Sequence, residues 1–139
     1  MGLQVYLAGP LFTDAERQYN LIVKEKLEEK GLDVFLPQEL DIDFSSEAWQ
    51  SDTFNANVKH IDDSDIIIAI LDGPICDDGT SWEVGYSWAK GKKIFGLRTD
   101  FRTVGPEGIV NLMLGCSIDI FNDIETLIEE VLIYDMSRN

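Results

Sequence analysis

One unbroken apolar run limits what this chain can fold into. Residues 65–71 read Asp-Ile-Ile-Ile-Ala-Ile-Leu, with no polar side chain after the first position. A half-exposed strand alternates apolar and polar residues, whereas a central parallel strand is buried on both faces and stays apolar throughout. The run therefore predicts a parallel sheet with this segment at its centre.

The rest of the chain alternates between strand-like and helix-like segments. We expect further strands at Gln4–Ala8, Val34–Leu36, Lys93–Leu97 and Ser117–Phe121, and helices at Asp14–Lys30, Ser51–Asp63, Thr80–Lys90 and Ile124–Asp135. Segment 38–51 is polar and acidic, without a clear period, and is expected to be a long loop. Such alternation favours a parallel sheet covered by helices on both faces. The 139 residues are thus predicted to form one α/β domain, a doubly wound five-stranded sheet of flavodoxin-like order 2-1-3-4-5.

The composition narrows the class of partner. The chain has 26 Asp and Glu against 11 Lys and Arg, a net charge of -15. This charge repels phosphate backbones and anionic lipid, so we expect no nucleic acid or membrane partner. Cys76 and Cys116 form no disulfide framework and have no metal-ligand spacing, and no apolar stretch approaches the roughly 20 residues of a membrane span. The sequence therefore predicts a cytoplasmic protein that binds neutral or cationic small molecules, or another protein surface.

In the predicted fold, a ligand binds at the carboxyl ends of the strands, beside the switch point between the first and third strands. Three connections should meet there: Gly9–Phe12, Asp72–Gly79 and the turn after Leu97.

Glu83 and Asp77 are the carboxylates best placed for chemistry at this edge. Glu83 is expected in the first turn of a helix, whose N-terminus would keep it ionised at neutral pH. An ionised carboxylate on a rigid element can attack a sugar carbon, while Asp77, six residues upstream, can supply a proton or accept from a base. A structural interpretation stands beside this one, because Thr80-x-x-Glu83 also fits a capping box.

The first loop contributes three further candidates. Gly9 permits a ligand to approach the backbone closely, and Tyr6 and Phe12 can flank a flat ring or orient a carboxylate. Alternatively, Tyr6 is a core residue of its strand and Phe12 is a hydrophobic staple for the following helix. The loop matches neither a P-loop nor a dinucleotide-binding glycine motif, so it predicts no phosphate cradle.

Three motifs then occur in order along the chain. The apolar run ends in Asp72-Gly73, the following loop and helix read Asp77-Asp78-Gly79-Thr80-Ser81-Trp82-Glu83-Val84-Gly85-Tyr86, and the helix ends in Lys90-Gly91-Lys92-Lys93. Together with Val5–Pro10 and Asn111-Leu112-Met113, they resemble the nucleoside 2-deoxyribosyltransferase family. The resemblance spans most of the chain and favours a catalytic role for Glu83.

The resemblance implies a role for each matching residue. Glu83 would attack C1′ of a 2′-deoxynucleoside and form a covalent deoxyribosyl-enzyme, and a free nucleobase would then attack from the vacated face. Asp77 would hydrogen-bond the base and assist its protonation, Tyr6 would orient the nucleophile and Phe12 would contact the base. Gly79, in the same loop as Asp77, is counted with the substrate-binding residues.

The resemblance also implies an assembly. Asn111 and Met113 would reach into the site of a neighbouring subunit, where the asparagine would bind the 5′-hydroxyl of the sugar. The expected protein is therefore a homo-oligomer, a dimer or larger, that acts on a 2′-deoxynucleoside and a free nucleobase. The resemblance implies no metal or organic cofactor.

One position departs from the family pattern. Many members carry an aspartate eight residues before the aspartate that opens the central strand, and this chain has Asn57 there. An amide can hydrogen-bond a base but cannot protonate it, so protonation would fall more heavily on Asp77.

Two other functions remain open from the sequence. A related branch hydrolyses deoxynucleoside 5′-monophosphates, but needs phosphate-binding Ser, Gly and Arg residues in the first loop, where this chain reads Gly-Pro-Leu-Phe-Thr-Asp and has Arg17 as the only nearby cation. A non-catalytic module that senses nucleosides or nucleotides is the other alternative. The presence of both Asp77 and Glu83 favours an enzyme.

Overall fold

The computed structural model describes residues 2–139 and contains a single five-stranded sheet. The elements in chain order are β1 (Gln4–Ala8), α1 (Asp14–Glu28), β2 (Asp33–Phe35), η1 (Pro37–Glu39), α2 (Trp49–Asp63), β3 (Ile66–Ile70), α3 (Asp78–Ala89), β4 (Lys93–Leu97), η2 (Gly105–Glu107), α4 (Leu112–Gly115), β5 (Asp119–Phe121) and α5 (Ile124–Ser137). The two η elements are single turns of 3-10 helix.

The sheet confirms the predicted fold class and strand order. All four strand pairs are parallel, and the order is β2-β1-β3-β4-β5. Every residue of β3 is buried, as its unbroken apolar sequence predicts. The topology reverses between β1 and β3, which places the switch point at the carboxyl ends of these two strands.

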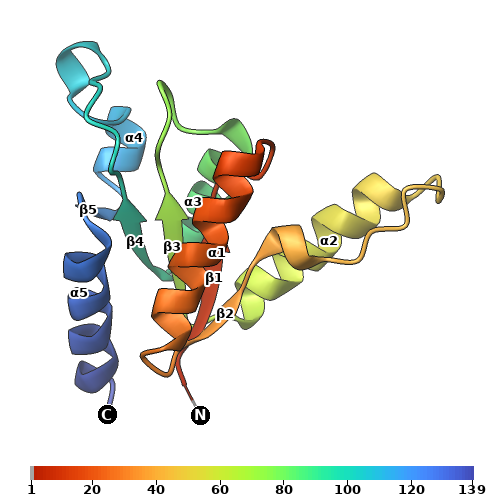
Figure 1. The fold of residues 1–139 in the computed structure, drawn as a ribbon, viewed down its shortest axis with the longest axis horizontal. Helices are drawn as coiled ribbons and strands as arrows, with labels where there is room; N and C mark the ends of the chain where they lie inside the picture. Colours follow the sequence, from red (N-terminus) through yellow and green to blue (C-terminus); the bar gives the residue numbers. More distant parts are fainter. Residues whose placement is uncertain (1) are drawn as a thin grey trace.

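Helices cover both faces of the sheet (Figure 1). One core cluster joins α1 and α5 to the sheet through Val23, Leu27, Leu127 and Val131, and it includes Leu7 of β1. The second cluster joins α2, α3 and α4 to the other face and includes Tyr6. Because side chains alternate along a strand, Tyr6 points toward α2 and α3 while its neighbour Leu7 points away from them.

Several boundaries differ from those predicted. Helix α3 begins at Asp78, two residues before the expected start at Thr80, because Asp77 and not Thr80 caps it. Segment 38–51 is not one long loop, since it contains part of η1 and the first turn of α2. The helix α4 was not expected, and β5 is two residues shorter at its start than predicted. Helix α1 begins at Asp14 as predicted, and Thr13 and Glu16 form a capping box at its start.

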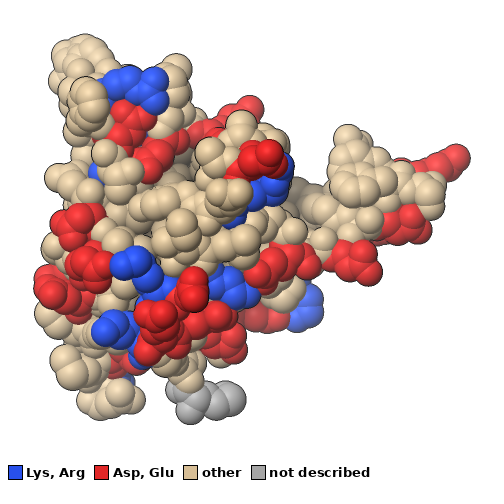
Figure 2. Space-filling model, viewed as in Figure 1, with Lys and Arg blue, Asp and Glu red and all other residues tan. Residues whose placement is uncertain are grey.

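Helix α2 and the segment before it extend sideways from the body of the molecule (Figure 1). The surface is dotted with carboxylates, and several of its basic groups lie against them (Figure 2). Lys26 contacts Glu125 at 2.7 Å and Arg138 contacts Asp65 at 2.9 Å, for example. No described helix is long and apolar enough to cross a membrane.

Candidate active site

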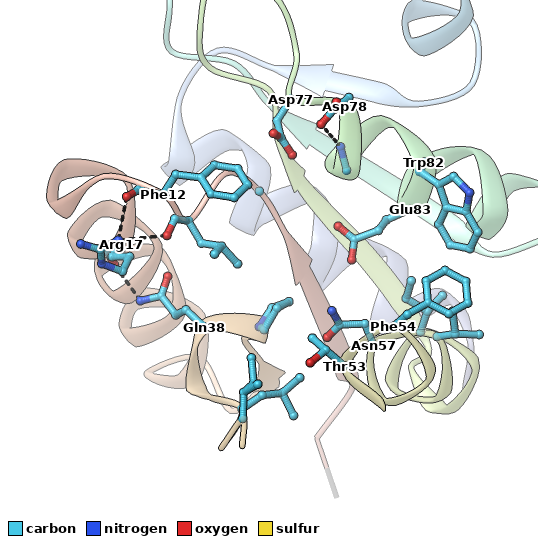
Figure 3. Close-up of a pocket in the computed structure, with 18 of the residues that line it drawn as sticks. Phe12, Arg17, Gln38, Thr53, Phe54, Asn57, Asp77, Asp78, Trp82 and Glu83 are labelled. Carbon is cyan, nitrogen blue, oxygen red and sulfur yellow. Dashed lines mark hydrogen bonds between the residues drawn. The ribbon is translucent and has the colours of Figure 1, made fainter. Parts of the chain in front are cut away.

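A cleft of about 990 Å³ opens at the switch point of the sheet. Its walls are the β1–α1 loop, η1 with the segment that follows it, one side of α2 and the first turns of α3 (Figure 3). The lining is largely apolar, and its aromatic members are Phe12, Phe44, Trp49, Phe54 and Trp82. Such a cleft, apolar with a few polar groups, suits a flat organic ring.

Glu83 projects from α3 into this cleft (Figure 3). Its Oε2 accepts a hydrogen bond from the Tyr6 hydroxyl, which leaves Oε1 for a ligand. Glu83 is the sixth residue of α3 and so lies in the second turn, and its carboxylate bonds Tyr6 instead of a backbone N–H at the helix start. The prediction of a capping box with Thr80 is therefore wrong, as is the expected place in the first turn.

Burial changes the charge state of Glu83. Removal from water and the negative charge of Asp77 raise its pKa, the Tyr6 hydrogen bond lowers it, and the net pKa is about 7. Glu83 is therefore only partly ionised at neutral pH and not fully ionised as predicted, because the prediction relied on a helix N-terminus that this carboxylate does not reach. Burial and the nearby Glu83 charge raise the pKa of Tyr6 well above its usual range, so its hydroxyl remains a donor.

Asp77 caps α3 and also lines the cleft. Its Oδ2 accepts from the backbone N–H of Thr80 at 2.9 Å and from the Thr80 hydroxyl at 3.0 Å. Oδ1 is left for a ligand. A Cβ on Gly79 would lie 3.3 Å from Asp77 Oδ2, so a side chain there would crowd the cap. The structure therefore brings Asp77, Gly79 and Glu83 together at one wall.

The β1–α1 loop forms the facing wall. Phe12 is 68% exposed and turns its ring toward the cleft, so the staple interpretation is wrong (Figure 3). The residue it would pack against, four positions into the helix, is Arg17, whose guanidinium donates to the Phe12 carbonyl at 2.9 Å. Gly9 lines the cleft, and a Cβ there would lie 3.1 Å from Ile70 Cβ, so close packing on β3 also requires glycine.

The turn after Leu97 does not line the cleft, contrary to expectation. It instead secures the loop that follows β3. Buried Arg98 donates to the carbonyls of Leu71 and Gly73, and Asp72 accepts from the backbone N–H groups of Thr99 and Asp100. The loop leading to Asp77 is thus tied at its start.

Helix α2 and η1 supply a wall that sequence reasoning missed. The unpredicted lining residues include Gln38 of η1 and Thr53 and Phe54 of α2, together with Trp82 of α3. Trp49 was placed in a loop although it opens α2. Phe54 and Trp82 pack edge to face with ring centroids 5.2 Å apart, yet both remain about half exposed. The available signal in the sequence was the presence of aromatic residues in a weakly periodic, acidic helix, which indicates aromatic side chains that are not part of the core.

The three remaining candidates lie in two places. Asn57 lines the cleft from α2, and its Oδ1 is covered by protein without a hydrogen-bond partner among the described residues. Asn111 and Met113 lie at the start of α4, exposed and outside the set that lines the cleft, with Asn111 accepting from the Met113 N–H. No group of three or more His, Cys, Asp or Glu side chains within residues 2–139 is arranged to hold a metal.

Comparison with known proteins identifies the family. The sequence profile of the nucleoside 2-deoxyribosyltransferases matches residues 5–128. The chain belongs to the nucleoside 2-deoxyribosyltransferase family. Members of this family act on deoxynucleosides and nucleobases. The chain therefore has the fold of an enzyme that acts on nucleosides.

Three individual proteins are similar to this chain, and one of them is a 2-deoxyribosyltransferase. A 2-deoxyribosyltransferase of Bacillus psychrosaccharolyticus is 28% identical, with a TM-score of 0.77 and 89% of each chain covered. A conserved protein of Enterococcus faecalis is also 28% identical, with a TM-score of 0.83 over 96% of this chain and 99% of that one. An uncharacterized protein of Ureaplasma parvum is 38% identical over 116 residues, which is 72% of each chain.

Proposed function

We propose that this family member transfers 2-deoxyribose between nucleobases, with Glu83 as the nucleophile. The observation that carries the proposal is the setting of Glu83. One carboxylate oxygen is held by the Tyr6 hydroxyl and the other is free in an apolar cleft, beside a second carboxylate. A fixed carboxylate in such surroundings is suited to covalent catalysis at a sugar carbon.

The reaction has two displacements at C1′. In the first, the free oxygen of ionised Glu83 forms a bond to C1′, the glycosidic C1′–N bond breaks, and its electron pair leaves with the base. In the second, a nitrogen of the incoming base attacks C1′ and the ester bond to Glu83 breaks. Two inversions give net retention. The positive charge that develops on the sugar is stabilised by the carboxylate of Glu83.

Asp77 is suited to manage the proton. The leaving base must gain a proton, and the incoming base must lose one, so a single acid-base group can serve both steps. The Oδ1 of Asp77 is left free by the cap, whereas Asn57 cannot exchange a proton. We assign base protonation to Asp77.

The cleft of one chain is open, and a glycosyl-enzyme must be kept from water for transfer to exceed hydrolysis. We infer that a second subunit closes it, with Asn111 and Met113 reaching the neighbour's sugar. The exposure of these residues supports this inference, because Met113 is 73% exposed and neither residue lines the cleft of its own chain.

A nucleoside fits this cleft better than a nucleoside 5′-monophosphate. Arg17 is the only cation among the described lining residues. Its guanidinium already donates to the carbonyls of Leu11 and Phe12 and pairs with Asp14 at 2.5 Å. A phosphate would therefore meet an engaged arginine and a chain of net charge -15.

The test is incubation with 2′-deoxyinosine and free adenine, followed by chromatography. We expect new 2′-deoxyadenosine from the unaltered protein and none from Glu83→Ala. The yield should be unchanged in Glu129→Ala, which removes an exposed carboxylate of α5 that does not line the cleft. Mass spectrometry of the unaltered protein with donor alone should show a deoxyribosyl adduct that Glu83→Ala lacks.

The other outcomes identify the alternatives. Hypoxanthine and free deoxyribose without a new nucleoside would indicate a hydrolase. Cleavage of 2′-deoxynucleoside 5′-monophosphates in preference to nucleosides would contradict the choice of substrate. Binding of nucleosides without any turnover would indicate a sensing module.

A further inference from the structure

Two side-chain amides from different elements line the cleft, and one of them is locked in orientation. Gln38 of η1 accepts at Oε1 from Asn20 at 2.9 Å and donates from Nε2 to the Arg17 carbonyl at 3.0 Å. Asn20 is 2% exposed and its Nδ2 also donates to the Pro10 carbonyl at 2.9 Å. Because a donor holds one end of the Gln38 amide and an acceptor holds the other, only one orientation satisfies both.

The second amide, Asn57 of α2, has no such restraint. Its Oδ1 is covered and unpartnered within residues 2–139, and no hydrogen bond is drawn at either end of the amide in Figure 3. Thr53 lies one turn earlier on the same side of α2, and its hydroxyl donates a hydrogen bond to the Trp49 carbonyl at 2.6 Å, not to Asn57. A half-turn of the Asn57 amide about its last bond therefore breaks no hydrogen bond and exchanges two groups of similar size.

An unpartnered amide in an apolar cleft is costly to the free protein and is relieved when a ligand supplies a partner. Nucleobases offer such partners in opposite arrangements. A 6-amino purine places a donor at position 6 beside an acceptor at position 1, and a 6-oxo purine reverses both. A fixed amide matches one arrangement at a given atom, whereas a freely turning amide matches either.

We propose that Asn57 allows this cleft to bind nucleobases of opposite hydrogen-bonding pattern, by turning its carbonyl or its amino group toward the same place on the base. The inference rests on the proposed function for the class of ligand, a 2′-deoxynucleoside, but it concerns binding and not turnover. Asn57 thereby sets the breadth of base selection, while the locked Gln38 amide keeps its orientation.

Binding of 2′-deoxyadenosine and 2′-deoxyinosine by calorimetry tests the proposal, on the Glu83→Ala background so that neither ligand is consumed. With Asn57 present, the two dissociation constants should agree within about threefold. At a pH where its new carboxyl is ionised, Asn57→Asp can only accept hydrogen bonds at this position, so the two constants should separate by about tenfold or more. The nucleoside that still binds then shows which base atom faces position 57.

Two matched variants complete the design. Thr53→Val removes a hydroxyl from the same side of α2 and should leave the ratio of the two constants unchanged. Asn57→Leu should weaken both nucleosides by similar factors, and should raise the melting temperature of the free protein by a few degrees because it removes the unpartnered amide. If Asn57→Asp fails to fold, Asn57→Leu carries the test.

The outcomes are separable from those of the proposed function. A ratio that stays near one in Asn57→Asp, unaltered affinities in Asn57→Leu, or a tenfold preference already present with Asn57 would each overturn the inference. Failure of both nucleosides to bind would overturn it as well. Absence of transfer from the unaltered protein, with the predicted binding pattern intact, would contradict only the proposed function.

Discussion

At the scale of single residues, the pair Tyr6 and Glu83 controls the pH dependence of the first chemical step. Attack on C1′ needs the ionised carboxylate, so the rate should rise with pH through the Glu83 pKa of about 7. The Tyr6 hydrogen bond lowers that pKa because it stabilises the charged form. Tyr6→Phe should therefore move the acidic limb of the rate profile to higher pH.

The measurement is the rate of adduct formation against pH in single turnovers. Tyr6→Phe should lose most activity below neutral pH and recover part of it in alkali, where Glu83 ionises in both proteins. Tyr86→Phe is the control, because the Tyr86 hydroxyl donates to Asp62 outside the cleft. An unshifted limb in Tyr6→Phe would show that Tyr6 does not set the charge state of Glu83.

The resemblance indicated Glu83 and the Tyr6 hydroxyl that orients it, but the residues alone did not show how deeply the carboxylate is buried. Tyr6 lies 77 positions away along the chain, and their contact forms because side-chain alternation in β1 turns Tyr6 toward α3. The predicted full ionisation of Glu83 failed because that burial was not visible in the sequence. Local spacing suggested a helix dipole, whereas the pKa follows from burial by distant segments.

At the scale of elements, Asp77 has two tasks that substitution can separate. It caps α3 through Thr80, and its remaining oxygen is free in the cleft. Asparagine caps a helix about as well as aspartate, so Asp77→Asn should keep stability within about 0.5 kcal/mol while losing proton transfer. Asp77→Ala should lose activity and about 1 kcal/mol of unfolding free energy.

Asp123 provides a matched control for the cap. At the start of α5 it accepts from the backbone N–H of Thr126 at Oδ1 and from the Thr126 hydroxyl at Oδ2, 2.8 Å each, so it caps its helix with both oxygens and lies outside the cleft. Asp123→Ala should thus lose stability by urea denaturation and retain transfer. Since the charge of Asp77 raises the Glu83 pKa, any activity left in Asp77→Asn should have its acidic limb at lower pH, opposite to Tyr6→Phe.

Elements were predicted well where the apolar pattern is long and poorly where it is short. The strands Gln4–Ala8 and Lys93–Leu97 have the predicted bounds, and Thr13 starts α1 as its capping box indicates. The same capping pattern at Thr80 was misleading, because Asp77 caps the helix instead and accepts two hydrogen bonds from Thr80. The four-residue α4 has too few residues to show a helical period.

At the scale of the whole molecule, the proposed site is divided between two chains. Glu83 would come from one subunit, and Asn111 from its neighbour. Glu83→Ala and Asn111→Ala should then each lose transfer when pure, Asn111→Ala through poor sugar binding. A mixed dimer of the two variants has one site with both substitutions and one site with neither.

Random exchange of subunits between equal amounts of the two variants makes about half of the dimers mixed, each with one of two sites intact. Transfer should therefore recover to about a quarter of the unaltered level. Native mass spectrometry checks that exchange has occurred. Because each chain carries a net charge of -15, added salt should screen the repulsion between subunits and tighten the assembly. Proven exchange without recovered transfer would place Asn111 outside the neighbour's site, and a monomer at all concentrations would leave each cleft to close on its own chain.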